Sequence, residues 1–526
     1  MLWIFLKKMH AISLLCTLLY ATHASDAYKA LVVFPVPAKS HSILGEGIVR
    51  NLLEAGHEVT YMTPYPKAQK KHPSLREIDI STKINPIPEN RMNIEKLMKN
   101  QGDRPALTYP LTLFLNLQKT FLEHEEAQKL FNDPKEQFDV VIVEWMFADL
   151  ISGISAVFNC PYIWVSPIEP HWMVLKLIDE VPNTAYVPDA KSGIAAPFTM
   201  LERVTELLKM TLNYGIQKFY ISQLEQEAYE RLLVPMIKKR GHKVPDFDEI
   251  RYNASLMLGN SHVSTGQSIR LPQNYKAVGG YHIDNNLTPL PEGLKKLLDN
   301  SRHGLIYFSM GSNLRSQYMP SELKTSLLKM FGRLKQTVLW KFEEDLPNRP
   351  ENVYIVQWAP QLSILAHPNC ILFITHGGLL STTETIYFGK PIIGIPVFAD
   401  QFTNVDRCVR RGFAKRVDLS YTMADDLEKA ISDIIADPSY SVKAKEVSFI
   451  YHHRPVPPGK ELAHWVEHVV RTGGAPHLRS PALIVPWYQK CYLDLVILVF
   501  LILYALKSII RKLHSCVRKQ EKRKVQ

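Results

Sequence analysis

Residues suited to holding a phosphorylated ligand gather between positions 358 and 401 of the chain. A short apolar run, Cys370–Ile374, predicts a buried strand, and the turn Thr375–Gly378 follows it directly. The next segment is compatible with a helix that ends at Gly389. A strand, a turn with two glycines and a helix place unpaired backbone N–H groups and the positive end of a helix dipole at one point. The pattern therefore predicts a phosphate-binding turn.

Side chains on either side of this turn supply groups that suit a nucleoside. Glu384 lies seven residues after Gly377, which is two helical turns, so both face the same side of the helix. Its carboxylate can accept hydrogen bonds from both hydroxyls of a ribose whose phosphates lie on the turn. Trp358 offers a flat aromatic face to a base, and Gln361 offers a hydrogen-bonding edge.

Two further strand ends contribute to the same region. Pro391–Pro396 predicts a short strand, and Asp400 and Gln401 follow it at the carboxyl end of the sheet, where open α/β folds bind ligands. Gly304–Ser309 predicts another strand, which begins a second α/β pattern. The residues around its end are small enough to let a ligand come close, and the candidate contacts are Ser309, Gly311 and Ser312.

In this order and spacing, residues 358–401 resemble the signature of the UDP-glycosyltransferases along its whole length, in the form of membrane-anchored, insect-like animal members. The resemblance implies a UDP-sugar donor and the GT-B type of fold, with two facing Rossmann-like domains. It also implies a donor contact for each signature residue: Trp358 on uracil, Gln361 near the nucleoside, His376, Gly377 and Gly378 on the diphosphate, Glu384 on the ribose, Asp400 and Gln401 on the sugar. Leu380 and Ser381 replace an Asn-Gly pair frequent in vertebrate members.

A histidine near the start of the chain is the candidate general base. His41 lies in a predicted loop, Pro35–Ser42, between the strand Tyr28–Phe34 and a helix from about residue 44 to 55. An imidazole with a pKa near 6.5 can take a proton from a hydroxyl at neutral pH, and a nearby carboxylate stabilises the imidazolium. The resemblance places the family's base in this loop and its partner acid after the strand Phe138–Val143.

Two acids compete for the role of partner to His41. Glu144 holds the equivalent position, where the family usually has Asp, and its extra methylene displaces the carboxylate. Asp149, five residues later, therefore stays as an alternative. The mechanism that follows is a direct displacement, in which His41 deprotonates an acceptor hydroxyl that attacks the anomeric carbon with inversion. We expect no metal and no cofactor, since the sequence has no convincing Asp-x-Asp pair in a strand-end loop and the UDP-sugar is a co-substrate.

Two other classes of protein are weighed against a transferase. A nicotinamide or flavin oxidoreductase is disfavoured because PVPAKSHS, and no Gly-x-Gly-x-x-Gly, follows the first strand. A catalytically silent family member that binds UDP-sugars stays open because of Glu144. The acceptor expected for an enzyme is a hydroxyl on a small lipophilic compound, in detoxification or conjugation. Glucose is the favoured sugar, while glucuronic acid, galactose and xylose stay open, as does the oligomeric state.

The order of elements predicts an α/β chain of two domains. Residues 26–285 form the expected acceptor-binding domain, which opens as a βαβ unit, and residues 286–470 form the expected donor-binding domain with a return helix. The stretch Pro272–Asn300 is rich in Pro, Gly and Asn, and it predicts the linker. Residues 190–243 predict amphipathic helices, which either line the acceptor side or pack in the core.

Charge and cysteines exclude several partners. The net charge of +11 is concentrated in the tail from Lys507 to Lys524, which carries +7, and in Lys7 and Lys8, so the rest of the chain carries only +2. This distribution gives no support to nucleic-acid binding. Six cysteines at scattered positions show neither zinc-ligand spacing nor a disulfide framework.

The first residues of the chain predict entry into the secretory pathway, and the last residues predict a membrane anchor. Residues 1–25 read as a signal peptide, and 488–510 as a transmembrane helix, whose 19 apolar-rich residues from Tyr492 to Ile510 would span roughly 28 Å. The basic tail, 511–526, places this end in the cytosol and resembles a dilysine retrieval signal. We therefore expect a single-pass type I protein of the endoplasmic reticulum membrane with lumenal catalytic domains. The predicted glycosylation sites are Asn253 and Asn286.

Overall fold

The computed structural model describes residues 27–67, 72–84, 93–99, 108–189, 192–312, 314 and 316–524. The predicted signal peptide, residues 1–25, lies outside these ranges. The chain divides into two compact units, one that ends at Leu478 and one that begins at Arg479. The first unit holds two parallel sheets, which we call the first and second lobes.

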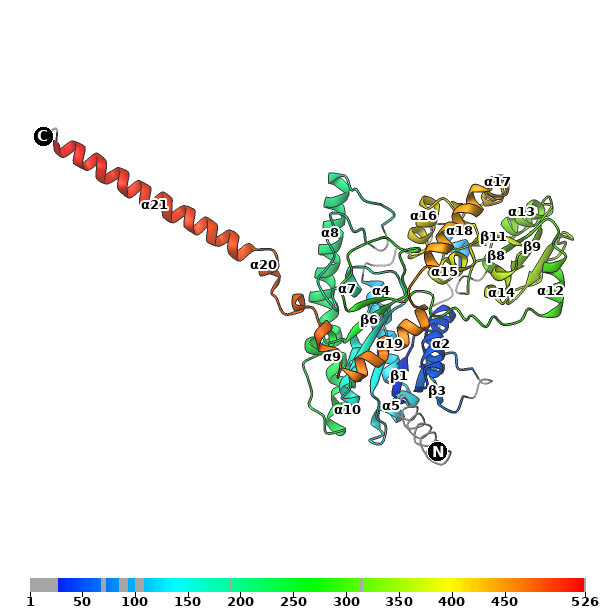
Figure 1. Ribbon diagram of the computed structural model, residues 1–526, viewed down its shortest axis with the longest axis horizontal. Coiled ribbons are helices and arrows are strands. Elements are labelled where there is room, and N and C mark those ends of the chain that lie inside the picture. The colour runs from blue at the N-terminus through cyan, green and yellow to red at the C-terminus, as the bar shows by residue number, and fades with distance from the viewer. Residues whose placement is uncertain are drawn as a thin grey trace, which may run out of the picture. The chain divides into compact units, whose positions relative to one another are not determined.

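The first lobe is built on a seven-stranded sheet with the order β3-β2-β1-β4-β5-β6-β7, in which all neighbours are parallel (Figure 1). Its central strands are continuous apolar runs, because helices cover both faces of a parallel sheet. The strands are β1 (Lys29–Val33), β2 (Glu58–Thr63), β3 (Leu75–Asp79), β4 (Val140–Glu144), β5 (Tyr162–Ser166), β6 (Leu256–Gly259) and β7 (Tyr275–Ala277).

The second lobe has a six-stranded parallel sheet with the order β10-β9-β8-β11-β12-β13. Its strands are β8 (Leu305–Ser309), β9 (Thr337–Lys341), β10 (Val353–Val356), β11 (Cys370–Thr375), β12 (Ile392–Gly394) and β13 (Ala414–Arg416). The two sheets confirm the predicted fold class, with two Rossmann-like halves. Four strands, β3, β6, β7 and β13, were not predicted, because they are short or carry charged residues.

Helices connect the strands of both sheets. In the first lobe they are α2 (Lys39–Glu54), α4 (Tyr109–Leu122), α5 (Glu125–Asn132), η2 (Leu150–Gly153), α6 (Ile154–Phe158), α7 (Trp172–Leu175), α8 (Met200–Ile216), η3 (Gln217–Ile221), α9 (Ser222–Leu232), α10 (Val234–Lys239) and α11 (Phe247–Arg251). In the second they are α12 (Glu292–Asp299), η4 (Ser316–Tyr318), α13 (Ser321–Phe331), α14 (Gln361–Ala366), α15 (Leu379–Phe388), α16 (Gln401–Arg410), α17 (Met423–Ala436) and α18 (Ser439–His452).

Two helices join the lobes. The short helix α3 (Ile94–Met98) comes from the first part of the sequence, yet Ile94 is fully buried in the core of the second lobe. The return helix α19 (Pro458–Arg471) lies against the first lobe, where Leu462 and Val466 pack beside α2 and the central strands. The family resemblance implied that the return helix α19 packs on the first lobe. The domain prediction did not include the packing of α3 on the second lobe.

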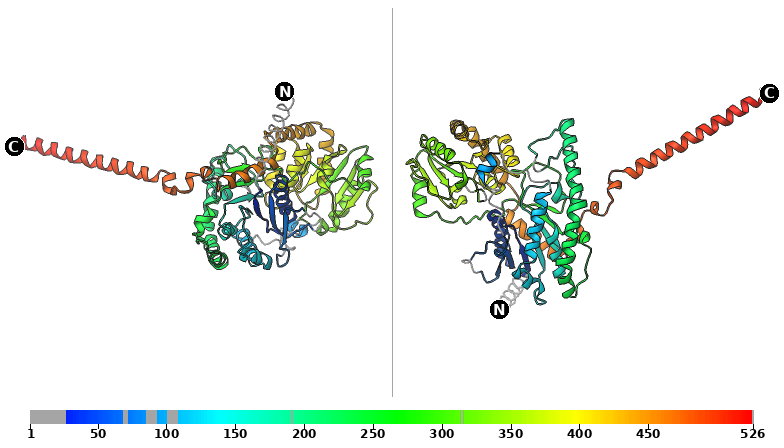
Figure 2. Two further views of the ribbon diagram at one scale, coloured as in Figure 1. Left: turned by 60° about the horizontal axis from the view of Figure 1, so that its bottom comes forward. Right: turned by 180° about the vertical axis from the view of Figure 1, so that it is seen from behind.

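Only part of the helical stretch predicted over residues 190–243 packs in the core, where Ala228 and Tyr229 of α9 and Met236 of α10 are buried. Within α8 only Glu206 is buried, and apolar residues such as Leu201 and Leu208 are exposed, so α8 is not a core helix. Among the described residues of this stretch, 192–243, none lines the large cavity of the first unit. Figure 2 shows α8 as the long green helix on the outside of the first lobe. The stretch predicted as a linker, in turn, contains β7 and α12.

The second unit contains η6 (Pro481–Leu483), α20 (Trp487–Lys490) and α21 (Leu493–Lys524); η5 (Pro476–Leu478) closes the first. Residues Leu493–Lys519 of α21 are long and apolar enough to cross a bilayer, with a mean hydropathy of 2.5 over the best window and no buried residues in it. The helix begins at Leu493, so it includes every residue of the predicted span from Tyr492 to Ile510 except Tyr492.

The packing of α19 on the first lobe predicts a stability effect. Leu462 is fully buried, so Leu462→Ala leaves a cavity and should lower the free energy of unfolding by about 2–5 kcal/mol. The midpoint of urea unfolding of the full chain in detergent measures this loss. Leu207→Ala on α8, where the side chain is half exposed, is the matched control and should change stability by about 0.5 kcal/mol or less. Equal effects of the two variants would contradict the docking of α19.

Candidate active site

A cavity of about 1470 Å³ lies between the lobes, at the carboxyl ends of strands from both sheets. This is where ligands bind in open α/β folds. Most of the residues predicted from the sequence line this one cavity: His41, Ser309, Gly311, Ser312, Trp358, Gln361, His376, Gly378, Glu384, Asp400 and Gln401. Residues more than 300 positions apart in the sequence therefore meet in one place.

The sequence had predicted a loop at His41. In the structure, His41 lies in the first turn of α2. Pro35 and Pro37 lack a backbone N–H, and the N–H of Ala38 donates to the carbonyl of Val36 at 2.8 Å, so a tight turn precedes the helix. Ala38 is extended and serves as the N-cap, so the helix begins at Lys39. The earlier start fixes the backbone of His41, which makes the direction of the imidazole better defined than it would be in a loop.

Glu144 is the partner of His41. It is the last residue of β4, its side chain is fully buried, and its Oε1 contacts Nδ1 of His41. Nδ1 bonded to a carboxylate leaves Nε2 as the nitrogen that can take a proton. Burial lowers the pKa of His41, but the charge of Glu144 and its hydrogen bond, with a smaller contribution from Asp400, outweigh burial and raise the pKa above 6.5.

Asp149 does not contact His41. It lies just before η2, is fully buried, and accepts a hydrogen bond from Trp145 Nε1 at 2.8 Å. Its own backbone N–H donates to Glu225 at 2.7 Å, and Glu225 pairs with Arg251 at 2.9 Å. Asp149 thus belongs to a buried network of the first lobe. Of the two candidate acids, the structure thus brings Glu144, at the end of β4, into contact with His41, and it places Asp149 elsewhere.

The predicted phosphate-binding turn has the expected backbone. Gly377 has a φ of 80°, and a Cβ there would overlap Val405. Gly378 is the N-cap of α15, and no side chain caps this end of the helix, so its first N–H groups are open to a ligand. Burial lowers the pKa of His376 to about 4, with the charge of Lys341 adding to the effect, so the ring is neutral at physiological pH.

A cation that sequence reasoning missed stands beside this turn. Lys341 ends β9 and its Nζ donates to the carbonyl of Gly311 at 2.8 Å. It lines the cavity together with the Gly311 turn, in which the N–H of Gly311 donates to Ser309 Oγ at 3.3 Å. The lysine directly follows the apolar residues Val338–Trp340 at the end of a strand, so its sequence context gave no sign of a site.

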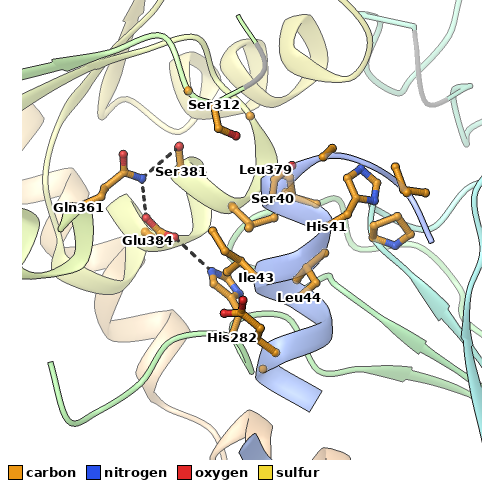
Figure 3. Close-up of a pocket in the computed structure, with 18 of the residues that line it drawn as sticks. Ser40, His41, Ile43, Leu44, His282, Ser312, Gln361, Leu379, Ser381 and Glu384 are labelled. Carbon is orange, nitrogen blue, oxygen red and sulfur yellow. Dashed lines mark hydrogen bonds and ion pairs between the residues drawn. The ribbon is translucent and has the colours of Figure 1, made fainter. Parts of the chain in front are cut away.

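The residues predicted to contact the nucleoside lie together in the cavity. Gln361 Nε2 donates to Glu384 Oε2 at 2.5 Å and to Ser381 Oγ at 3.2 Å, as Figure 3 shows. Trp358 is half exposed, and Lys39 Nζ lies 3.3 Å from the centre of its ring. The aromatic face, the amide and the carboxylate thus lie along one wall of the cavity.

The acid–amide pair after β12 is held by α16. Asn404 Nδ2 donates to Asp400 Oδ2 at 2.9 Å. Burial raises the pKa of Asp400, and the hydrogen bond from Asn404 opposes this shift. Gln401 uses its Oε1 to accept from the N–H groups of Val397 at 2.9 Å and Phe398 at 3.1 Å, so its carbonyl fixes the loop.

The wall of the cavity on the first lobe is apolar. Phe114 and Phe147 stack with their ring centres 5.6 Å apart, and Met146 and Ile168 lie in the same wall. None of these residues was predicted, because single apolar residues on separate elements look like ordinary core positions. The two predicted glycosylation sites, Asn253 and Asn286, are both exposed. In the part of the chain that the structure describes, no three His, Cys, Asp or Glu side chains are placed to hold a metal.

Comparison with known proteins agrees with this geometry. The family model described as UDP-glucoronosyl and UDP-glucosyl transferase matches residues 29–525. The chain belongs to this family. It is 33% identical over 491 residues to UDP-glycosyltransferase UGT5 of Dactylopius coccus, which covers 92% of this chain and 91% of the relative. It is 28% identical over 471 residues to UDP-glucuronosyltransferase 2B15 of Rattus norvegicus, with 85% and 86% covered.

Solved structures show the same fold. UGT89C1 of Arabidopsis thaliana, complexed with quercetin, matches with a TM-score of 0.57 at 15% identity, over 85% of this chain and all of that one. A glycosyltransferase of kitacinnamycin matches with a TM-score of 0.57 at 17% identity, over 84% and 99%. The protein is a UDP-glycosyltransferase of the GT-B fold, and its donor substrate is a UDP-sugar.

The contact between His41 and Glu144 predicts a pH dependence. A base must be deprotonated to act, so activity falls below its pKa, and a raised pKa puts the acidic limb of kcat/KM above pH 6.5. Glu144→Gln removes the charge that raises this pKa, so the limb should move to lower pH while the rate falls. The pH profile of glycosyl transfer by the UDP-glycosyltransferase measures both effects.

Asp149→Asn is the matched control for this prediction, because it removes the charge of a buried acid that contacts Trp145 and does not contact His41. This variant should leave the acidic limb where it is in the unmodified enzyme. A limb that moves with Asp149→Asn and stays in place with Glu144→Gln would reverse our assignment of the two acids.

Proposed function

We propose that this UDP-glycosyltransferase moves a hexose, preferably glucose, from UDP to a hydroxyl of a small lipophilic acceptor, with inversion and without a metal. The observation that carries the proposal is the contact between His41 and Glu144 at the cavity wall of the first lobe, opposite the phosphate-binding turn of the second. A base on one lobe and a leaving-group site on the other suit a single in-line displacement.

In the proposed reaction, Nε2 of His41 removes the proton of the acceptor hydroxyl, and the buried carboxylate of Glu144 stabilises the imidazolium. The acceptor oxygen forms a bond to the anomeric carbon as the bond from this carbon to the phosphate oxygen breaks. The negative charge moves onto the diphosphate of UDP. The N–H groups at the start of α15 and the Lys341 ammonium stabilise that charge in place of a metal ion.

The preference for glucose is supported by the sign of the charge near the proposed sugar position. Asp400 is half-buried at the cavity and near enough to His41 for its charge to raise the pKa of that imidazole, so its carboxylate suits the hydroxyls of a neutral sugar as a hydrogen-bond acceptor. The carboxylate of a glucuronic acid would meet like charge there. The stacked Phe114 and Phe147, with Met146 and Ile168, favour a lipophilic acceptor, as expected for conjugation of xenobiotics and endogenous compounds.

The chemistry predicts a chelator-resistant reaction that needs His41. The full chain in detergent is incubated with simple phenols and each of several UDP-sugars, with and without EDTA, and UDP release and conjugate mass are followed. Conjugates should form equally with EDTA, fastest from UDP-glucose, and His41→Ala should lower the rate about 10²–10⁴-fold. Loss of activity in EDTA that Mn²⁺ restores would contradict the metal-free mechanism.

The same assay tests the role of Asp400. Asp400→Asn keeps the size of the side chain and its contact with Asn404 but removes the charge. It should narrow the preference for UDP-glucose over UDP-glucuronic acid and leave the affinity for UDP itself nearly unchanged. If the variant loses UDP affinity and keeps its sugar preference, Asp400 does not lie at the sugar.

We also propose that the protein is a single-pass type I glycoprotein of the endoplasmic reticulum membrane, with its catalytic unit in the lumen. The apolar helix Leu493–Lys519, the basic tail after it and the exposure of Asn253 and Asn286 support this arrangement. In sealed microsomes, protease should remove only the C-terminal tail, and a glycosidase should lower the mass of the detergent-released chain. Digestion of the catalytic unit in sealed microsomes would contradict the topology.

A further inference from the structure

One buried histidine of the cavity has no role in the reaction described above. His282 is 4% exposed, and among the described residues neither ring nitrogen makes a hydrogen bond. Its Nε2 lies 3.4 Å from Glu384 Oε1, and both residues line the cavity. Figure 3 shows His282 between α2 and Glu384. A buried imidazole without full hydrogen bonding costs free energy, so folding alone does not explain its presence.

The backbone that carries His282 is tied to the helix of the general base. Arg50 of α2 donates from Nη2 to the carbonyls of Tyr281 at 2.9 Å and Ile283 at 3.1 Å, and from Nη1 to that of His282 at 3.3 Å. Asn51 Nδ2 adds a hydrogen bond to the carbonyl of Tyr281 at 3.0 Å. We call the segment Tyr281–Ile283 the strap.

Close packing fixes the distance between the strap and α2. Gly47 faces the strap, and a Cβ at this position would lie 2.8 Å from Cα of His282, nearer than real Cβ atoms come. The helix therefore approaches the strap through a glycine, where any side chain would push it away. His41 and Gly47 belong to the same helix. The close packing at Gly47 therefore fixes the position of the strap relative to the general base.

The geometry points to His282 as a positioning residue for Glu384, and this inference rests on the proposed use of Glu384 to bind the ribose. Gln361 donates to one carboxylate oxygen, and His282 Nε2 lies 3.4 Å from the other, so groups from two elements flank the carboxylate and restrict its orientation. Each oxygen keeps a lone pair for a ribose hydroxyl. Helix α2, which bears the general base, thereby acts on the donor site through the strap and His282.

This role predicts a loss that depends on the ribose hydroxyls. Binding of UDP and of 2′,3′-dideoxy-UDP to the full chain in detergent is measured by calorimetry. His282→Ala should weaken UDP binding about tenfold, which is about 1.4 kcal/mol, and leave the dideoxy nucleotide nearly unchanged. His282→Gln, which restores an N–H donor, should recover most of the affinity. In a Glu384→Gln background, His282→Ala should have little further effect.

His72→Ala is the matched control, because His72 also lines the cavity but makes no contact with Glu384. It should leave the affinity for both nucleotides unchanged. Equal weakening of UDP and the dideoxy nucleotide by His282→Ala would show a purely structural role, and full UDP affinity in that variant would show no role; either overturns the inference. If the unmodified chain itself fails to bind UDP, the proposed donor site fails first, and the inference falls with it.

Arg50→Ala tests the strap without altering His282. Releasing the strap from α2 should reduce the preference for UDP over the dideoxy nucleotide in the same direction as His282→Ala, and it should raise the donor KM more than it lowers kcat. An Arg50→Ala enzyme with the full preference for UDP would show that the strap does not position His282.

Discussion

The contact between a fully buried carboxylate, Glu144, and the imidazole of His41 is the constraint on which the account of this enzyme depends. One oxygen of Glu144 contacts His41, and among the described residues the other has no hydrogen-bond partner, so the histidine is the group that offsets the cost of burying the charge. The same contact selects the ring nitrogen that faces the cavity and raises the pKa of the base. Glu144, the residue that had kept a silent binder open because it stands in place of Asp, thus still brings a carboxylate to the histidine.

The predicted diphosphate site is built by a different principle, since backbone N–H groups and a helix end act there together with side chains. The turn at Gly377 and Gly378 opens the start of α15 to a diphosphate, and neutral His376 lies beside it. Helix α2 belongs to both sides, because its first turn carries the base and its middle is strapped to the segment of His282. The packing of α2 against the strap therefore connects the helix of the base with the residue beside Glu384.

Sequence reasoning predicted what is local. The apolar strands, the strand–turn–helix signature and the long apolar helix near the C-terminus are each continuous in sequence, so pattern and spacing were enough to predict them. The start of α2 was misplaced, because nothing in the side chains of Ala38 and Lys39 signals a helix cap. The choice between Glu144 and Asp149, the exposure of α8, and the places of Lys341, Phe114 and His282 depend on which elements meet in space. No local pattern contains that information.

The central claim is a single displacement, with a base on the first lobe acting on a sugar held by the second. The anomeric configuration of the product tests it most directly. Proton NMR of the conjugate formed from an α-configured UDP-sugar should show a β-glycoside, because attack and departure occur on opposite faces of the anomeric carbon. An α-glycoside would contradict the account, since retention requires a second nucleophile or a different path for the leaving UDP.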